Sequence, residues 1–510
     1  MNINDLVRYW GRNRPDHDAI IFGDTAVTWR ELDAISDALA RGLAKRGVRH
    51  GDRVGILMTN KPEVAALMLA TVKLGAICAP LNFRLKGNEL ATLIEDADPK
   101  VVVADGDLVG LLEEAGRSRE FEIFALGGED LPPYSDLLVE DGPVPVADVA
   151  GDDPAFICYT SGTTGVQKGA LLTHAGILSV GQSACLAHGL TGKDRVLAAA
   201  PLVYTGSGIS VFMQFVVYPG STMVLLEEFD PERALDILEK YQVTATTMVP
   251  VIWERMMTLP RFGEARLAEF SFAGAGGAPV RLDLLEAFRS RGIPLTQVYG
   301  LTEASGLAAS MRYEDAVSRP GFAGLPLLGT DIRIAAAEGG FAGPDEVGEI
   351  LVKGPHVMKG YWRRPEETAE TVVDGWLRTG DVGLQDGQGF LKLIDRSKDM
   401  LISGGLNVYP AEIERVLAGV EGVAELAVIG VPDEQWGEVP MVVLRCDGDQ
   451  EEVLSRLAAV SKEQLAGFKQ PRHAIVSDEP LPRTFSGKLS KVVLRERYDK
   501  VPEHAVPLKR

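Results

Sequence analysis

Cysteine is scarce in this chain, and the few that occur are widely spaced. The 510 residues include four cysteines, with no CxxC pair among them. This spacing indicates neither a structural zinc site nor a disulfide framework. We therefore expect a reduced, cytoplasmic protein in which Cys78, Cys158, Cys185 and Cys446 have structural roles.

Long apolar runs are also missing. No run of about 18 apolar residues occurs that could cross a bilayer as a helix. The opening segment, MNINDLVRYWGRNRPD, lacks the continuous apolar core of a signal peptide. These absences predict a protein with no membrane span.

Basic residues are outnumbered by acidic ones. Lys and Arg total 52 against 72 Asp and Glu, which gives a formal net charge of −20. An acidic chain repels phosphate backbones over most of its surface, and no concentrated basic segment offsets that repulsion. Nucleic acid is therefore not an expected partner. If the ligands are small anions, a few local Lys or Arg side chains must supply the positive charge.

What is present is the composition of a packed protein with more than one domain, because single cores stop growing beyond about 250–300 residues. Hydrophobic residues make up 46% and charged residues 24%. Helical spacing occurs at 33–47 and 61–75, and short apolar runs at 54–58, 101–105 and 222–226 resemble buried strands. This alternation predicts parallel α/β sheets to about residue 330, then a more β-like stretch, and an α+β block from about residue 398.

The most informative segment is YTSGTTGVQKG, residues 159–169, which follows the apolar run AFIC. A strand that leads into Ser, Gly, Thr and Lys residues offers backbone N–H groups, hydroxyls and an ammonium to a polyphosphate. The segment is not a Walker A loop, which would need Gly at Gln167 and a hydroxyl at Gly169. The alternative interpretation is a flexible Gly/Thr surface turn.

This segment resembles the phosphate loop of the adenylate-forming superfamily, which includes acyl-CoA synthetases, firefly luciferase and the adenylation domains of peptide synthetases. Further motifs follow in the order of that family. One departure is Gln167, where the family usually has Pro. The further motifs are GAGGAP at 274–279, YGLTE at 299–303, TGD at 379–381, DRSKDMLISGGLNVYPAEIE at 395–414 and PRTFSGK at 482–488.

The resemblance implies ATP, Mg²⁺ and coenzyme A as ligands. Lys488 matches the catalytic lysine, Thr302 is placed at the α-phosphate, and Glu303 with Thr164 is placed at Mg²⁺. Lys398 matches the hinge between domains, and Asp381 and Arg396 are placed at the ribose. The full set implied for nucleotide and cofactor is Thr160, Ser161, Gly162, Thr163, Thr164, Lys168, Gly276, Gly277, Ala278, Tyr299, Asp381, Arg396, Lys398, Gly404 and Gly405.

The acid pocket follows by resemblance from the run PLVYTGSGISVFMQF, in which Tyr204 stands where a His is common. The runs at 249–253 and 305–307 join it, and none of these runs contains a charged residue that could pair with a second carboxylate or an ammonium. A fatty, alicyclic or aromatic monocarboxylic acid is therefore expected. The predicted substrate-binding residues are Tyr204, Thr205, Gly206, Gly208, Val249 and Gly306.

The function implied by the resemblance is an AMP-forming acyl-CoA synthetase. Its implied fold has a large N-terminal domain, residues 1–396, of stacked α/β subdomains with a β-barrel-like subdomain, and a small mobile α+β domain, residues 397–510. The alternative is a free-standing adenylation enzyme that loads a carrier protein. Small-molecule carboxylic acid, ATP and CoA are the expected partners, and a homodimer stays open. His174, near the phosphate segment, is interpreted as structural.

Overall fold

The computed structural model describes residues 1–85, 87–115, 121–128, 131–145, 147–160, 167–267, 269–278, 280–316, 318–336, 338–396, 399–403, 406–483 and 489–508; the side chains of Ser207, Arg396 and Asn407 are also outside this description. The chain divides into two compact units. The first comprises Met1–Arg333, Leu351–Thr379 and Gly389–Leu391, and the second Ile334–Ile350, Gly380–Gln388 and Lys392–Arg510. The predicted junction at 396/397 remains a proposal.

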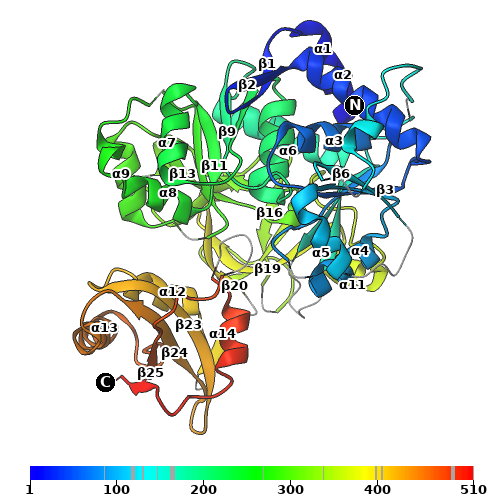
Figure 1. Cartoon of the computed structure of the whole chain (residues 1–510). Coiled ribbons are helices and arrows are strands. Elements are labelled where there is room, and N and C mark those ends of the chain that lie inside the picture. The colour runs from blue at the N-terminus through cyan, green and yellow to red at the C-terminus, as the bar shows by residue number, and fades with distance from the viewer. Residues whose placement is uncertain are drawn as a thin grey trace. The chain divides into compact units, whose positions relative to one another are not determined.

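The first sheet of the large unit is mostly parallel, as the sequence predicted, and ends in an antiparallel pair. Helices lie over it (Figure 1). In sheet order the strands are β6 (Glu122–Leu126), β5 (Val101–Asp105), β3 (Arg53–Leu57), β4 (Ile77–Pro80), β7 (Pro154–Thr160) and β8 (Lys168–Thr173).

A second run of strands is parallel in its centre, from β1 to β13, and antiparallel at both ends. In order the strands are β15 (Phe322–Pro326), β14 (Ala309–Ser310), β13 (Leu295–Tyr299), β12 (Phe272–Gly276), β11 (Ala245–Met248), β9 (Arg195–Ala198), β10 (Thr222–Leu225), β1 (Asp18–Phe22) and β2 (Thr25–Thr28).

Several helices of the large unit begin at a residue whose side chain caps the first turn. The Thr28 hydroxyl accepts a hydrogen bond from the Glu31 N–H, and the Glu31 carboxylate accepts one from the Thr28 N–H, so α2 starts in a capping box. The helices are α1 (Ile3–Asn13), α2 (Trp29–Lys45), α3 (Pro62–Lys73), α4 (Gly87–Ala97), α5 (Val109–Glu114), α6 (His174–His188), α7 (Pro231–Lys240), α8 (Pro250–Met257), α9 (Leu282–Ser290), α10 (Tyr313–Ala316) and α11 (Pro365–Thr371).

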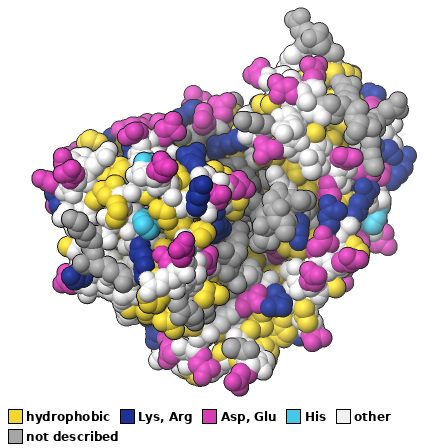
Figure 2. All heavy atoms as spheres, turned by 90° about the horizontal axis from the view of Figure 1, so that it is seen from below, with side chains coloured by type: hydrophobic (Ala, Val, Ile, Leu, Met, Phe, Trp, Pro, Cys, Tyr) yellow, Lys and Arg dark blue, Asp and Glu magenta, His cyan; other side chains and the backbone are white. Residues whose placement is uncertain are grey.

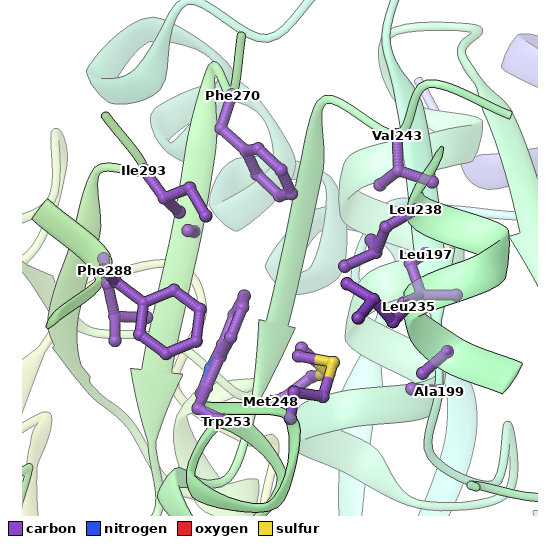
Figure 3. Close-up of a cluster of buried hydrophobic side chains, with 14 of the residues drawn as sticks. Leu197, Ala199, Leu235, Leu238, Val243, Met248, Trp253, Phe270, Phe288 and Ile293 are labelled. Carbon is purple, nitrogen blue, oxygen red and sulfur yellow. The ribbon is translucent and has the colours of Figure 1, made fainter. Parts of the chain in front are cut away.

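The core beside the second run of strands is formed by apolar side chains from α7, α8 and α9 (Figure 3). The Trp253 ring is fully buried there, packs edge-on against Phe288 at 5.0 Å between ring centroids, and donates its indole N–H to the Gly274 carbonyl at 3.0 Å. Burying an aromatic side chain of this size stabilises the fold by about 1.5–3 kcal/mol.

A buried ion pair joins α2 to α3. The Lys73 ammonium is fully buried and lies 2.6 Å from a carboxylate oxygen of Asp33 and 2.6 Å from one of Asp37. Removing one partner of such a group leaves an uncompensated charge, so Lys73 fixes the register of the two helices.

Strands β16 (Asp331–Ile334), β17 (Gly348–Lys353), β19 (Trp376–Gln385) and β20 (Leu391–Arg396) follow one another in the more β-like stretch that the sequence predicted, with β18 (Val372–Val373) beside β19. Their order among the described residues is an open run, so a barrel-like subdomain remains a prediction.

The smaller unit has a sheet of its own. Helices α12 (Pro410–Leu417), α13 (Gln450–Gln464) and α14 (Lys491–Arg497) accompany it. The sheet order is β22 (Leu406–Val408), β21 (Leu401–Ser403), β24 (Gly437–Cys446), β25 (His473–Val476) and β26 (Val506–Pro507), and β23 (Val423–Asp433) also pairs with β24. Within the described ranges, no helix combines the length and apolar character needed to cross a bilayer.

Candidate active site

Strands β7 and β8 form a hairpin that presents the two ends of the predicted phosphate segment. Thr160 and Lys168 are directly opposite each other in the antiparallel register. The four residues predicted between them, Ser161, Gly162, Thr163 and Thr164, lie outside the described residues. A hydroxyl and an ammonium therefore stand side by side where the chain leaves and re-enters the sheet.

Glu303 follows Thr160 by 143 residues in the sequence and contacts the hairpin in the folded chain. It lies in a short 3₁₀ turn, Thr302–Ala304, which follows β13. The Thr160 hydroxyl donates to Glu303 Oε1 at 3.5 Å, and the Met358 N–H donates to the Glu303 carbonyl at 2.8 Å. The structure thus brings together Thr160 and Glu303, which the sequence placed at phosphate and Mg²⁺, and Thr302 lies beside Glu303.

Tyr361 completes this cluster and was missed by sequence reasoning. Its phenol donates to Glu303 Oε1 at 3.0 Å, and the Lys168 ammonium lies 5.3 Å from the centroid of its ring. The segment around Tyr361 runs antiparallel to β8, with Trp362 N–H donating to the Gly169 carbonyl at 2.7 Å and Leu171 N–H to the Gly360 carbonyl at 2.9 Å. In the sequence, Tyr361 is noticeable only as part of an aromatic pair with Trp362 after Gly360. No neighbouring residue indicates a contact with Glu303.

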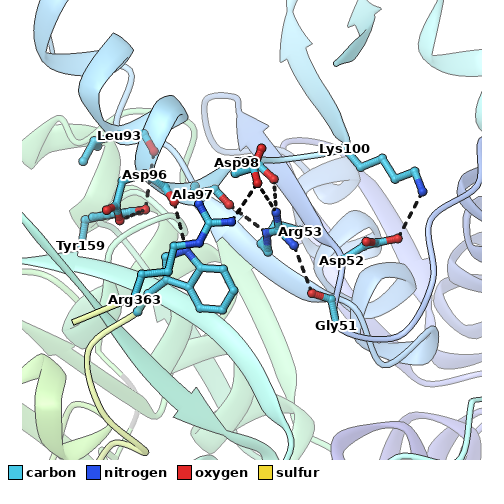
Figure 4. Close-up of polar contacts among 11 residues, drawn as sticks. Gly51, Asp52, Arg53, Leu93, Asp96, Ala97, Asp98, Lys100, Tyr159 and Arg363 are labelled. Carbon is cyan, nitrogen blue, oxygen red and sulfur yellow. Dashed lines mark hydrogen bonds and ion pairs between the residues drawn. The ribbon is translucent and has the colours of Figure 1, made fainter. Parts of the chain in front are cut away.

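Asp96, near the end of α4, contacts Tyr159 of the hairpin (Figure 4). Its carboxylate accepts a hydrogen bond from the Tyr159 phenol at 2.9 Å, and Arg364 pairs with the second oxygen at 3.1 Å. The Trp362 indole donates to the Asp96 carbonyl at 2.9 Å. Burial, reinforced by the Asp96 carboxylate, raises the pKa of Tyr159 well above its usual range, so the phenol stays a donor.

The predicted purine-binding segment follows β12. Gly276 is held tightly, because an added Cβ would approach Val298 Cγ2 to 2.6 Å. Gly277 has a φ of +82°, and both Gly277 and Ala278 are exposed. Tyr299 ends the neighbouring strand β13 and is 5% exposed. The small residues thus serve close packing at Gly276, and their contact with a purine stays a prediction.

Two predicted substrate segments lie against each other. Thr205–Ile209 and Val211–Val217 are π-helical, a geometry that is frequent at functional sites. An added Cβ at Gly306, whose φ is +99°, would approach Ser210 Oγ to 2.1 Å and Gly206 Cα to 3.8 Å. Gly206 itself faces open space, whereas Gly208 is packed against the backbone of Pro201 and Leu202.

Val249, the remaining predicted substrate residue, is half-buried directly before α8. Trp253, in the same apolar run, belongs to the core beside β12 and donates to Gly274. The apolar run 249–253 therefore contributes to the core at its Trp253 end.

Tyr204 stands immediately before the π-helical stretch. Its phenol donates to Asn82 Oδ1 at 3.3 Å. Burial raises the pKa of Tyr204, and the Arg84 guanidinium, in hydrogen-bonding reach of the phenol, opposes that shift. Sequence reasoning found no charge in the pocket segments themselves. The structure adds Arg84, an exposed cation, from more than 100 residues earlier in the chain.

The other predicted nucleotide residues fall in the smaller unit or outside the description. Asp381 is 7% exposed in β19. The side chain of Arg396 lies outside the described residues, as do Lys398, Gly404, Gly405 and Lys488 in full. Their roles remain predictions.

His174 and the cysteines have structural roles, and Cys158 lies beside Thr205 and within electrostatic reach of Glu303. His174 is fully buried, and its Nδ1 accepts a hydrogen bond from the Ile3 N–H at 3.3 Å, so its structural interpretation holds. The four cysteines are free thiols, and burial raises the pKa of Cys78 and of Cys158, which disfavours thiolate chemistry.

The oxygen groups of the cluster suit Mg²⁺. This ion binds through one or two carboxylates together with substrate phosphates, and it prefers oxygen ligands. Glu303 supplies a carboxylate beside the Thr160 hydroxyl. Among the described residues, no group of three His, Cys, Asp or Glu side chains could hold a metal unaided. Glu303 would therefore hold the ion jointly with a bound polyphosphate, whose charge the ion would partly neutralise.

Comparison with known proteins identifies the family. The model of AMP-binding enzymes matches residues 7–362, and the model of the AMP-binding enzyme C-terminal domain matches residues 412–488. The chain belongs to the AMP-binding enzyme family. Within this family it is an AMP-forming acid–CoA ligase that uses ATP, Mg²⁺ and coenzyme A.

Three similar proteins illustrate the relationship. A feruloyl-CoA synthase from Amycolatopsis sp is 38% identical over 493 residues, covering 96% of this chain and 97% of that protein. An indoleacetate–CoA ligase from Aromatoleum aromaticum is 37% identical over 507 residues, covering 97% of this chain and 98% of that protein. The crystal structure of ATP-bound MatB from Rhodopseudomonas palustris matches with a TM-score of 0.87 at 33% identity, covering 98% of this chain and 99% of that one.

Proposed function

We propose that this acid–CoA ligase activates a hydrophobic monocarboxylic acid, which is fatty, alicyclic or aromatic, through an acyl-adenylate. The single observation that carries the proposal is the meeting of the π-helical segment with Gly306. Neither segment contains a charged residue, and Gly206, within the π-helical segment, faces open space. Relatives named for feruloyl, indoleacetate and long-chain fatty-acid substrates support this class, and a 2-succinylbenzoate–CoA ligase is also among the similar proteins.

The chemistry requires two anions to meet, because a carboxylate must attack an α-phosphate that is already negative. Catalysis then depends on position and positive charge rather than on an acid–base pair. In this proposal Lys168 and Thr160 hold the phosphates, Glu303 helps to hold the metal ion, and Thr302 contacts the α-phosphate. Lys488 neutralises the approaching charges, and Asp381 and Arg396 hold the ribose.

In the second step the CoA thiol attacks the carbonyl of the acyl-adenylate. A thioester forms, and the bond from the acyl carbon to the AMP oxygen breaks, so AMP leaves. No enzyme nucleophile is needed, which agrees with the raised pKa of the buried thiols Cys78 and Cys158. Lys398 serves as the hinge and Gly404 and Gly405 as the CoA-side loop in this proposal.

The test is a panel of acids in a pyrophosphate-release assay, run with and without CoA. Apolar monocarboxylic acids, such as a hydroxycinnamate or a medium-chain fatty acid, should exceed malonate and amino acids by about a hundredfold in kcat/KM, because burying a second charged group among uncharged segments costs several kcal/mol. They should also exceed acetate, which has almost no apolar surface to bury. Malonate or an amino acid as the best substrate would overturn the proposal.

The matched control is Arg84→Gln. Arg84 is a cation in hydrogen-bonding reach of the Tyr204 phenol, so it is the group chosen to test pairing with a second carboxylate. Activity with a monocarboxylic acid should be unchanged in this variant, and any activity with a dicarboxylic acid should fall. Acyl transfer that requires a carrier protein and fails with CoA would instead support the carrier-loading alternative.

A further inference from the structure

Tyr361 contacts two groups of opposite charge, the Lys168 ammonium and the Glu303 carboxylate. The proposed function assigns the ammonium to phosphate and the carboxylate to the metal ion. The Tyr361 phenol donates to Glu303 Oε1 at 3.0 Å, and its ring faces the Lys168 ammonium at 5.3 Å. Within the part of the chain that the structure describes, no ion pair joins Lys168 to Glu303, although both contact this one side chain. A single residue therefore contacts the predicted phosphate ligand and the predicted metal ligand.

The backbone around Tyr361 is fixed on both sides. Its N–H donates to the Thr368 hydroxyl at 2.9 Å, and the next residue, Trp362, pairs with Gly169 in β8. Three residues earlier, the Met358 N–H donates to the Glu303 carbonyl. The ring is thus tied by its own chain to the strand that carries Lys168 and to the turn that carries Glu303.

The two interactions of Tyr361 use different parts of the ring. A phenol O–H that donates to a carboxylate oxygen orients the carboxylate without removing its negative charge. The face of an aromatic ring attracts an ammonium at this distance but leaves its N–H donors free. A direct pair between Lys168 and Glu303 would instead engage both charges with each other.

The phenol O–H donates and the Glu303 carboxylate accepts, so the hydroxyl proton of Tyr361 points at the predicted metal ligand.

We propose that Tyr361 is a positioning residue that keeps Lys168 apart from Glu303 and orients the Glu303 carboxylate toward a divalent cation. The inference rests on the proposed use of Lys168 for phosphate and Glu303 for metal. The hydroxyl of Tyr361 and the bulk of its ring have separate roles. The hydroxyl orients the metal ligand Glu303, and the ring keeps the Lys168 ammonium available to the nucleotide.

The experiment compares Tyr361→Phe with Tyr361→Leu in direct binding measurements. Mn²⁺ binding in the presence of ATP is followed by electron paramagnetic resonance, and ATP binding without metal by calorimetry. Tyr361→Phe should weaken Mn²⁺ binding by about tenfold to a hundredfold, as loss of a group that orients a metal ligand does. It should leave metal-free ATP binding unchanged, because the ring still separates the two charges.

Tyr361→Leu should weaken Mn²⁺ binding and also weaken metal-free ATP binding by about tenfold, the equivalent of one charge-assisted hydrogen bond. Adding Glu303→Gln to Tyr361→Leu should restore metal-free ATP binding, because Lys168 then has no carboxylate to pair with. A merely structural role of the ring predicts no such rescue.

The matched control is Tyr241→Phe, which also removes a phenol hydrogen bond, the one donated to the Gly23 carbonyl at 2.5 Å, outside the site. It should change neither binding constant. Unchanged Mn²⁺ binding in Tyr361→Phe would overturn the orienting role, and failure of Glu303→Gln to restore ATP binding would overturn the spacing role. If wild-type protein binds ATP and Mn²⁺ but activates no acid, the proposed function fails while both readouts for Tyr361 still stand.

Discussion

Two buried histidines should make the large unit sensitive to mild acid. His174 is 0% exposed and His356 is 2% exposed, and burial lowers the pKa of each from the ordinary 6.5 to about 4. At His174, Nδ1 already accepts the Ile3 N–H, so a proton there would break that bond. Asp153 and Asp5 oppose the shift at His174 but do not cancel it.

The sign follows from proton binding. Between pH 6.5 and about 4 the unfolded chain binds a proton at each histidine that the folded chain does not, so stability is lost as the pH falls through this window. From these pKa values, each histidine reduces the free energy of unfolding by about 0.8 kcal/mol at pH 6 and by about 2 kcal/mol at pH 5. Two independent sites give about 4 kcal/mol at pH 5 relative to pH 8.

The assay is urea unfolding followed by Trp fluorescence at pH 8, 6 and 5. We compare wild type with the double variant His174→Asn/His356→Leu, in which Asn retains an acceptor for the Ile3 N–H. The comparison uses the change in stability between pH 8 and pH 5, so a constant destabilisation of the variant cancels. The double variant should lose about 4 kcal/mol less over this interval. The control is His17→Gln, a change at an exposed histidine of the same unit. Equal pH dependence of the double variant and wild type would refute the reasoning.

Three further predictions concern the reaction. Lys488→Ala should abolish adenylate formation, at a loss of about 2.7–4 kcal/mol or more, yet spare thioester formation from supplied acyl-adenylate; equal loss in both half-reactions would contradict its role. Lys398→Pro should spare pyrophosphate release and block acyl transfer to CoA, because proline restricts the torsions that a domain rotation requires; wild-type rates in both assays would remove Lys398 from the hinge. Gly306→Ala should raise KM for bulky acids at least tenfold, because its Cβ would collide with Ser210 Oγ and its φ is positive; an unchanged KM would place the acid elsewhere.

Helices and strands were predictable where the spacing of apolar residues indicates them. The helical spacing at 33–47 and 61–75 corresponds to α2 and α3, and the apolar runs at 54–58, 101–105 and 222–226 correspond to β3, β5 and β10. The π-helical stretch was not predicted, because its wide turns depend on packing against Ser305 rather than on the apolar period. Gln214 and Ser210 both donate to the Ser305 carbonyl, at 2.6 Å and 3.3 Å, from within that stretch.

The sequence supplied candidate site residues, and their contacts could not be predicted from it. Resemblance placed Thr160 and Glu303 at one nucleotide, and the structure joins them across 143 residues of sequence. Tyr361 was missed because its partner Glu303 is 58 residues away, and because its pairing with Ala170 of β8 is an isolated bridge that no periodicity reveals. Arg84 was missed for the same reason, since its position beside Tyr204 follows only from the folded chain.

The proposed site residues are distributed over the two units. Thr160, Lys168 and Glu303, the proposed phosphate and metal groups, belong to the large unit together with Tyr361. The proposed ribose residues Asp381 and Arg396 fall in the smaller unit, as do the positions of Lys398 and Lys488, the proposed hinge and catalytic residues. Changes at Tyr361 should therefore alter ligand dissociation constants, and changes at Lys488 should alter turnover while ATP still binds. A Lys488→Ala protein that binds neither ATP nor Mn²⁺ would show that phosphate and metal binding do not depend on Lys168 and Glu303 alone, and the roles assigned to these two residues would fail.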